Sequence, residues 1–420
     1  MNNAQKDMPL RPAAVKAHAV QARAAKAVAV KKTTDTVSVM LLKMICLTVE
    51  YPKSAIPLIP AKTRIAVYKA IERLKADGIL AEVGKGSEKR LRFNAMYKGE
   101  SGEPKAFELV KEQLGQDYYE HYIGMVGEHQ KISTDKQKVD RRLRMAEVRA
   151  LMNHARIEHR EWMLPQLSYE SKEKGANFVG TGYYDSRYLK RMPGTEPEVV
   201  GYSRMCGLLI SHGGGYMVYN TQKCVQKDAP GGEGKMRSFI SYVLNRNWTP
   251  PRSITRDWLS YGKDSIVIGK SYDTAKLVLE AERKKYEKAT LRQKWDKRDD
   301  DTYFIPLSRY GGYMLWVMTR ERWRERINEA LLDNELLGHP GRAYDIYTPG
   351  DEKHYLAWFD SNIVTIRMVK ESVAAGDDYT ILCYEWQKEF LHKYIGDNVT
   401  IIPYSAETIK KIFIQQRVDE

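Results

Sequence analysis

The chain has 420 residues, of which 43% are hydrophobic and 29% are charged, so it is long enough for two or three domains and too apolar for wholesale disorder. Its net charge of +14 favours a polyanionic partner such as nucleic acid over a neutral one. Four widely spaced cysteines without a CxxC pair argue against a disulfide framework or a zinc motif. No stretch of the sequence reaches the apolar length that spans a bilayer, so we expect no membrane partner and a cytoplasmic location.

Residues 1–35 contain the tract AAVKAHAVQARAAKAVAVKK, which is nearly devoid of acidic residues. Alanine and lysine favour helix, but nothing in this segment supplies a packing partner, so we expect a basic flexible arm. Such an arm either lies along DNA phosphates or is a passive tail.

Residues 36–98 predict a winged helix-turn-helix. Residues 37–49 have the apolar spacing of a helix, and Ile65, Tyr68, Ile71 and Leu74 place a second apolar stripe on residues 63–77. Gly78 stands where a helix ends with a positive φ angle. Two short strands at residues 81–83 and 91–93, joined by a glycine-containing loop, predict the wing.

With that stripe turned inward, small and basic side chains of the second helix point toward a DNA groove. The predicted DNA-binding residues are Lys62, Thr63, Arg64, Ala66, Lys69 and Arg73 of the helix region, with Ala70 beside them, and Lys85, Lys89, Arg90 and Arg92 of the wing. In the alternative interpretation the module binds protein, and the same lysines only confer solubility.

Residues 104–170 predict a helical connector. Its second helix is rich in arginine, with Arg141, Arg142, Arg144 and Arg149 around an apolar side. Arginines in this pattern usually form a solvated face, although they can also extend a DNA footprint or support a homodimer.

From residue 175 onward, short apolar runs alternate with helices, which predicts a mixed α/β architecture in two units, residues 175–300 and 301–420. The sequences Gly214-Gly215-Tyr216-Met217 and Gly311-Gly312-Tyr313-Met314 resemble each other, and both are predicted to turn a hairpin. The similarity reflects either a duplicated unit or coincidence.

No complete catalytic or metal-binding constellation is recognised, so we expect no metal or cofactor and a protein that is not an enzyme. The GGEGK segment at residues 231–235 lacks the spacing of a phosphate-binding loop. Cys224 and His212 do not form a recognisable nucleophile and base. Asp360 and Glu385 follow predicted strands, and they are the candidate ligands if the α/β region is a metal-dependent nuclease.

The order of a basic winged helix, RRLRMAEVRALM, SRMCGLLISHGGGYMVYNT and YTILCYEWQ resembles proteins of bacterial plasmids and conjugative elements that are similar to the replication-relaxation group. The resemblance implies a winged helix followed by a nuclease-like α/β domain, and DNA binding in replication, transfer, maintenance or transcriptional control. Because the strand at residues 216–220 lacks acidic residues, any nuclease-like domain here is expected to be inactive.

We therefore expect a sequence-specific double-stranded DNA-binding protein of a mobile element. A metal-dependent nuclease and a non-catalytic protein-interaction scaffold are the two alternatives.

Overall fold

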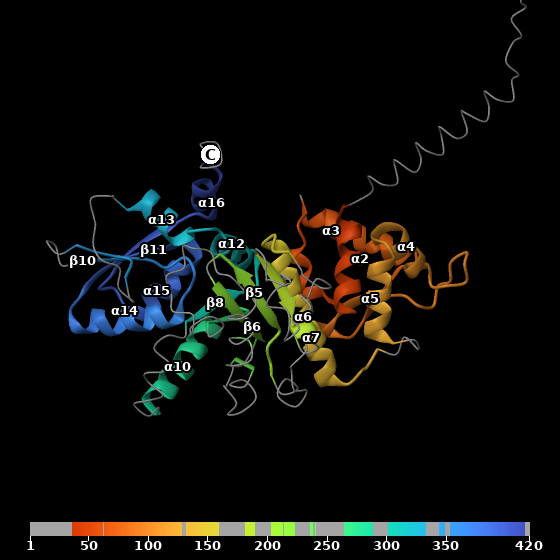
Figure 1. Cartoon of the computed structure of the whole chain (residues 1–420), viewed down its shortest axis with the longest axis horizontal. Coiled ribbons are helices and arrows are strands. Elements are labelled where there is room, and N and C mark those ends of the chain that lie inside the picture. Colours follow the sequence, from red (N-terminus) through yellow and green to blue (C-terminus); the bar gives the residue numbers. More distant parts are fainter. Residues whose placement is uncertain are drawn as a thin grey trace, which may run out of the picture. The chain divides into compact units, whose positions relative to one another are not determined.

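The structure of the protein is a computed structural model (Figure 1). It describes residues 36–61, 63–127, 132–158, 181–189, 203–212, 214–222, 236–237, 240, 264–288, 301–332, 344–348 and 353–415. The predicted basic arm at residues 1–35 lies outside this set. Helices and several sheets give a mixed α+β class, and the chain divides into two compact units: Met1–Lys53 with Ile59–Asp135, and Ser54–Leu58 with Lys136–Glu420.

The first unit is built around α2 (Thr36–Thr48), a helix that is buried on most of its surface. A helix that is apolar nearly all round must be covered on every side. Its cover comes from α3 (Arg64–Ala76), α4 (Lys105–Leu114), α5 (Gln116–Val126) and a small sheet, all of which contact α2.

The sheet of the first unit has three antiparallel strands. These are β1 (Tyr51–Pro52), β2 (Leu80–Val83) and β3 (Arg90–Phe93), in the order β1-β3-β2. The turn between β2 and β3 contains a short 3-10 helix, η2 (Gly86–Glu88). The predicted strands are therefore confirmed, each one residue longer than expected.

The predicted helical connector is not one body. Helices α4 and α5 belong to the first unit, where Tyr122 packs on Phe93 at a ring distance of 5.0 Å and on Phe107 at 5.7 Å. Helix α6 (Lys136–His154) belongs to the second unit. Aromatic packing, which the helical periodicity does not reveal, decides this division.

The second unit contains a five-stranded sheet in the order β4-β5-β6-β7-β8. Its strands are β4 (Gly182–Asp185), β5 (Gly207–Ser211), β6 (Gly214–Gln222), β7 (Ser265–Gly269) and β8 (Thr302–Pro306). The pairs β4–β5 and β5–β6 are antiparallel, and β6–β7 and β7–β8 are parallel. The fully buried run of β7 is typical of a strand with both faces covered.

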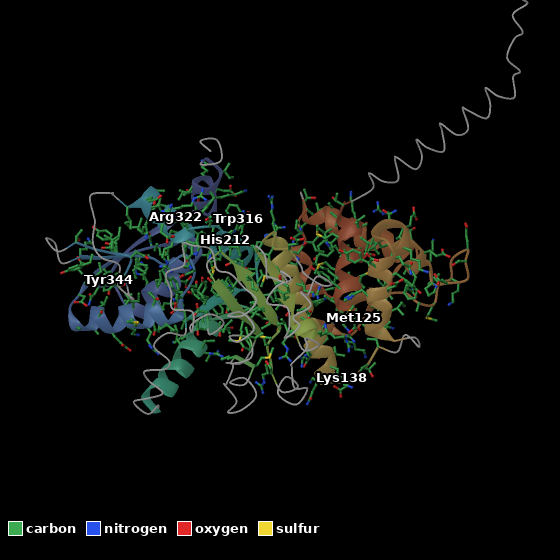
Figure 2. All side chains as sticks on the ribbon, in the orientation of Figure 1. Met125, Lys138, His212, Trp316, Arg322 and Tyr344 are labelled. Carbon is green, nitrogen blue, oxygen red and sulfur yellow. The ribbon has the colours of Figure 1, made fainter. Side chains whose placement is uncertain are left out.

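A second sheet has the order β12-β11-β10-β9. Its strands are β9 (Ile346–Thr348), β10 (Lys353–Ala357), β11 (Asp378–Tyr384) and β12 (Thr400–Tyr404), of which only β9 is antiparallel to its neighbour. The larger helices of this unit, besides α6, are α10 (Tyr272–Lys288), α12 (Arg309–Met318), α13 (Trp323–Leu331), α14 (Ile363–Ala375), α15 (Lys388–Ile395) and α16 (Ala406–Gln415). Trp316 of α12, labelled in Figure 2, meets Phe413 of α16 edge to face at 5.9 Å.

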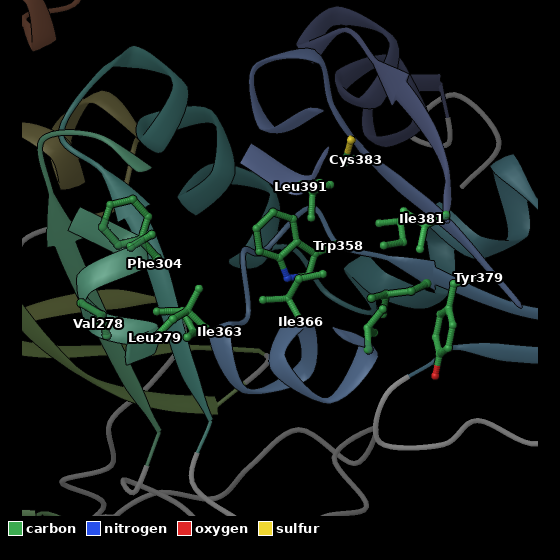
Figure 3. Packing of buried hydrophobic residues seen from close by; sticks show 14 of the residues in the cluster. Val278, Leu279, Phe304, Trp358, Ile363, Ile366, Tyr379, Ile381, Cys383 and Leu391 are labelled. Atoms are coloured by element: carbon green, nitrogen blue, oxygen red, sulfur yellow. The ribbon is translucent and has the colours of Figure 1, made fainter. Parts of the chain in front are cut away.

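The two sheets of the second unit share one hydrophobic core (Figure 3). Val267 and Phe304 of the first sheet and Ile381 of the second belong to the same buried cluster, together with Trp358. The backbone joins them as well, because the amide of Phe304 donates a hydrogen bond of 3.0 Å to the carbonyl of Ser361. The predicted boundary at residues 300 and 301 therefore separates β8 from the sheet to which it belongs, and it is not a boundary between units.

The two similar glycine-containing sequences have different structures. Gly214 and Gly215 lie in β6, whereas Gly311 and Gly312 lie in the first turn of α12, so the predicted second hairpin is wrong. A β-carbon on Gly311 would lie 1.9 Å from the carbonyl oxygen of Pro306. Gly311 thus allows α12 to lie directly on the end of β8, and the similarity carries no sign of duplication.

Gly311→Ala is expected to lower the free energy of unfolding by about 2–3 kcal/mol, because the new methyl group meets a backbone atom that cannot rotate away. Urea unfolding followed by circular dichroism measures the change. Gly124→Ala in α5 is the control, since a β-carbon there meets nothing within 4 Å, and it is expected to be neutral or stabilising. Equal effects at the two positions would contradict the packing explanation.

Candidate nucleic-acid interface

Helix α3 ends where the sequence predicts, and its start is fixed by a cap that was not predicted from the sequence. The side chain of Thr63 caps the helix by accepting a hydrogen bond of 3.2 Å from the amide of Ala66, and Gly78 follows the helix with φ +73°. Its buried residues are Val67, Ala70, Ile71 and Leu74. Its exposed residues include Arg64, Ile65, Tyr68, Lys69, Glu72 and Arg73.

The predicted orientation of α3 is partly wrong. Ile71 and Leu74 face the core as expected, but Ile65 is 66% exposed and Tyr68 is 46% exposed. Ala70, predicted to face outward, is 2% exposed, and Ala66 is half-buried. The buried stripe keeps the helical period but includes Val67 and Ala70, because small side chains let α3 lie close to α2.

Thr63 and Arg73, both predicted to face DNA, have partners within the first unit. The hydroxyl of Thr63 is used in the helix cap. Arg73 donates a hydrogen bond of 2.8 Å to the hydroxyl of Ser38 in α2, so its guanidinium is held against the protein while remaining exposed. Lys62 lies outside the described residues.

Three of the cations predicted to bind DNA are exposed, and their side chains have no hydrogen bond or ion pair within the part of the chain that the structure describes. Arg64 and Lys69 lie in the first two turns of α3, and Lys85 lies in the turn between β2 and β3. Ile65 and Tyr68 lie between the two helical cations in sequence. We call Arg64, Ile65, Tyr68 and Lys69 the α3 face.

The remaining predicted wing cations contact acidic residues or pack on the strand. Arg90 donates a hydrogen bond of 2.9 Å to Glu50, and the two side chains are 11% and 1% exposed, so this pair gives Arg90 a structural role, and its contact with DNA stays a prediction. Lys89 is exposed and lies 3.4 Å from Glu82, whose pKa is lowered by Lys53 and, to a lesser degree, by Lys89. Arg92 is half-buried on β3.

In the second unit, Arg324 of α13 joins two acidic residues. It donates to Asp345 at 3.0 Å and to Asp360 at 2.5 Å. Asp360 is 0% exposed, and burial raises its pKa to about 6 despite the attraction of Arg324. Asp360 therefore faces a cation of the protein, which does not fit the metal-ligand role considered for it.

Glu385, the other nuclease candidate, is the exposed first residue of a 3-10 helix, η4 (Glu385–Gln387). Among the described residues no group of three or more His, Cys, Asp or Glu side chains is arranged to hold a metal ion. The GGEGK segment and Cys224 lie outside the described residues, and His212 is half-buried. None of the described helices is long and apolar enough to cross a membrane.

The raised pKa of Asp360 predicts how pH changes stability. A carboxyl whose pKa is higher in the folded state stabilises the fold most below its ordinary pKa near 4, and this contribution is lost as the pH rises through about 6. The stability of the wild type relative to Asp360→Asn should therefore fall between pH 4 and pH 7, by on the order of 2 kcal/mol. Urea unfolding of both proteins across this range measures the difference, and a constant difference would contradict the assignment.

The arginine-rich helix α6 also departs from the prediction. Arg149 is fully buried and donates hydrogen bonds of 3.1 Å and 3.0 Å to Asp185 of β4. Asp185 receives a further hydrogen bond of 3.1 Å from Arg187. Arg149 therefore stabilises the second unit from inside, and only Arg141, Arg142 and Arg144 remain partly exposed.

Comparison with known proteins gives no relative: no family model, no curated protein and no solved structure matches the chain.

Proposed function

We propose that the chain binds double-stranded DNA through the α3 face. One observation carries this proposal: Arg64 and Lys69 are exposed, lie in the first two turns of a helix, and have no acidic partner among the described residues. The first turns of a recognition helix are the part that reaches base edges in the major groove. Cations in that position attract phosphates, and the net charge of +14 adds a long-range attraction.

The arrangement of the first unit supports a winged helix-turn-helix. Helix α2 is buried, α3 lies on it with one face exposed, and the antiparallel β2–β3 hairpin follows directly in the chain. In this arrangement the turn that carries Lys85 and Lys89 is the wing, and it contacts the DNA backbone beside the groove.

The apolar part of the α3 face has a role of its own in this proposal. Exposing Ile65 at 66% and Tyr68 at 46% has an unfavourable hydration free energy, which contact with a partner removes. In the major groove the matching apolar group is the methyl group of thymine. Ile65 and Tyr68 are therefore proposed to read thymine, while Arg64 and Lys69 bind phosphates.

Replacing thymine by deoxyuridine tests this role, because it removes only the methyl group. In a duplex selected by the wild type, the replacement at the contacted position is expected to weaken binding roughly fivefold or more, as expected for about 1 kcal/mol of base discrimination. Ile65→Ala should bind the two duplexes equally. An unchanged affinity of the wild type would contradict thymine reading while leaving phosphate binding untouched.

The proposal as a whole is tested by fluorescence anisotropy with a labelled duplex at increasing salt. If several cations bind the duplex, the logarithm of the binding constant K falls linearly with the logarithm of the salt concentration. The slope is nearly one for each phosphate that the protein neutralises. Lack of binding at physiological salt would favour the interaction scaffold, with the α3 face contacting protein. The proposed role in a plasmid or other mobile element rests on the sequence resemblance. The proposed homodimer rests on the palindromic DNA sites that helix-turn-helix dimers commonly bind.

A further inference from the structure

Three aromatic rings of the second unit form a stack that begins in the core. Tyr384, the last residue of β11, is 1% exposed, and its ring is 4.3 Å from that of Trp386 at an angle of 11°. Tyr310, in the first turn of α12, lies 4.3 Å from the same indole at 17°. The three residues come from segments that are far apart in the sequence.

The stack ends at the surface. Two rings parallel to one indole and equally near its centre cannot share a face, because they would overlap each other, so Tyr384 and Tyr310 lie on opposite faces of Trp386. Tyr310 is 50% exposed. Because Trp386 covers one face of Tyr310, the opposite face is the one on which a further planar ring can stack.

Polar atoms beside the stack have no hydrogen-bond partner. Within the described residues, the indole nitrogen of Trp386 is buried and unpaired. The hydroxyl of Ser308, which precedes α12 as its N-cap residue, is also buried and unpaired and makes no capping bond. Buried polar groups are nearly always satisfied, so each unsatisfied one needs an explanation such as a bound water or ion. Tyr384 is the last residue of the parallel strand β11, and Ser308 follows the parallel strand β8. The carboxyl ends of such strands are where α/β sheets bind ligands.

The charge around Tyr310 favours an anionic ligand. Arg309 in the first turn of α12 is exposed, and it donates its Nε hydrogen to the carbonyl of Pro57 at 3.0 Å. The amides at the start of this ten-residue helix carry partial positive charge. Lys388 at the start of α15 is an exposed cation, and Glu385, three residues before it, is an exposed acid.

From these observations we propose that the outer face of Tyr310 is a stacking platform for a nucleobase, with Arg309 and the start of α12 binding the adjoining phosphate. The base belongs to single-stranded DNA or RNA or to a free nucleotide, since a base in a duplex is covered on both faces. The site is in the second unit and is independent of the proposed duplex binding by the α3 face.

The test uses the full chain and a labelled oligothymidylate of about 12 nucleotides, a length within the site sizes of proteins that bind single strands. Tyr310→Leu keeps an apolar contact with Trp386 but removes the aromatic face, and Tyr310→Phe retains that face. Tyr310→Leu is expected to weaken binding roughly 5- to 150-fold, the range for loss of one stacked base, and Tyr310→Phe to bind as the wild type does. An abasic oligonucleotide of equal length should bind weakly and equally to all three proteins.

Competition with thymidine monophosphate distinguishes the two sources of the base. If thymidine monophosphate competes at a concentration near the dissociation constant of the oligonucleotide, the site binds a free nucleotide. If it does not compete, the site binds a single strand. Either result supports the platform. Equal binding of oligothymidylate by wild type and Tyr310→Leu, both folded by circular dichroism, would overturn it, as would equal affinity for the abasic strand. Arg64→Ala/Lys69→Ala should keep oligothymidylate binding at Tyr310, so loss of duplex binding leaves this result readable.

Discussion

Replacing Arg64 and Lys69 together by alanine is expected to lower the affinity for duplex DNA at least 30-fold at physiological salt. Each replacement removes an exposed cation that has no partner among the described residues, and a hydrogen bond between charged groups is worth about 1.5–3 kcal/mol. The slope of log K against log salt should become shallower by about 2, one for each lost phosphate contact. Fluorescence anisotropy at several salt concentrations measures both quantities.

A control of equal charge separates this contact from general basicity. Lys98→Ala/Lys105→Ala removes two exposed cations from the same unit, in the segment that follows β3 and at the start of α4. We expect this variant to bind duplex DNA within about threefold of the wild type, because a surface charge away from the contact acts only through screened, long-range attraction. Equal losses in the two variants would show that charge, and not the α3 face, determines binding.

Arg149→Met is expected to destabilise the second unit by about 3 kcal/mol, because it removes from the buried carboxylate of Asp185 a partner that is itself fully buried. Arg187 still contacts Asp185, but its side chain is 31% exposed and its attraction is correspondingly screened. Urea unfolding followed by circular dichroism measures the loss.

The double variant Arg149→Met/Asp185→Leu provides the matched control. Replacing both members of a buried ion pair by apolar residues is often neutral, so the double variant should recover most of the lost stability. A double variant as unstable as the single one would show that Arg149 acts through packing and not through its charge.

The pH dependence offers a second check. Burial alone raises the pKa of Asp185, but the attraction of Arg187 and Arg149 outweighs it and holds the pKa well below its usual range. The contribution of this carboxylate to stability is therefore present above pH 4 and is lost as the pH falls below it.

Local patterns predicted the elements well because each depends on residues close in sequence. Gly78 marks the end of α3, and the residues between β2 and β3 form a tight turn, as expected. The parallel strands of the second unit follow from their continuous apolar runs. Gly311 misled the prediction because a glycine pair is typical both of a turn and of a close contact between a helix and a strand.

The orientation of side chains was harder to predict because it depends on partners that are distant in sequence. The apolar period of α3 fits two adjacent stripes, and only the presence of α2 selects Val67 and Ala70 over Ile65 and Tyr68. Likewise, Arg90 and Arg149 have the charge of surface residues, but Glu50 and Asp185 hold them inside. A basic residue next to a buried strand is thus ambiguous until its acidic partner is known.

Site-specific photocrosslinking tests the role of the α3 face most directly. Benzoylphenylalanine at position 65, where Ile65 is 66% exposed, should crosslink to a bound duplex, and the same group at position 277, where Leu277 of α10 is 45% exposed, should not. Crosslinking at position 65 that disappears at high salt is the predicted result. Duplex binding without any crosslink from position 65, or with equal crosslinks from both positions, would contradict it.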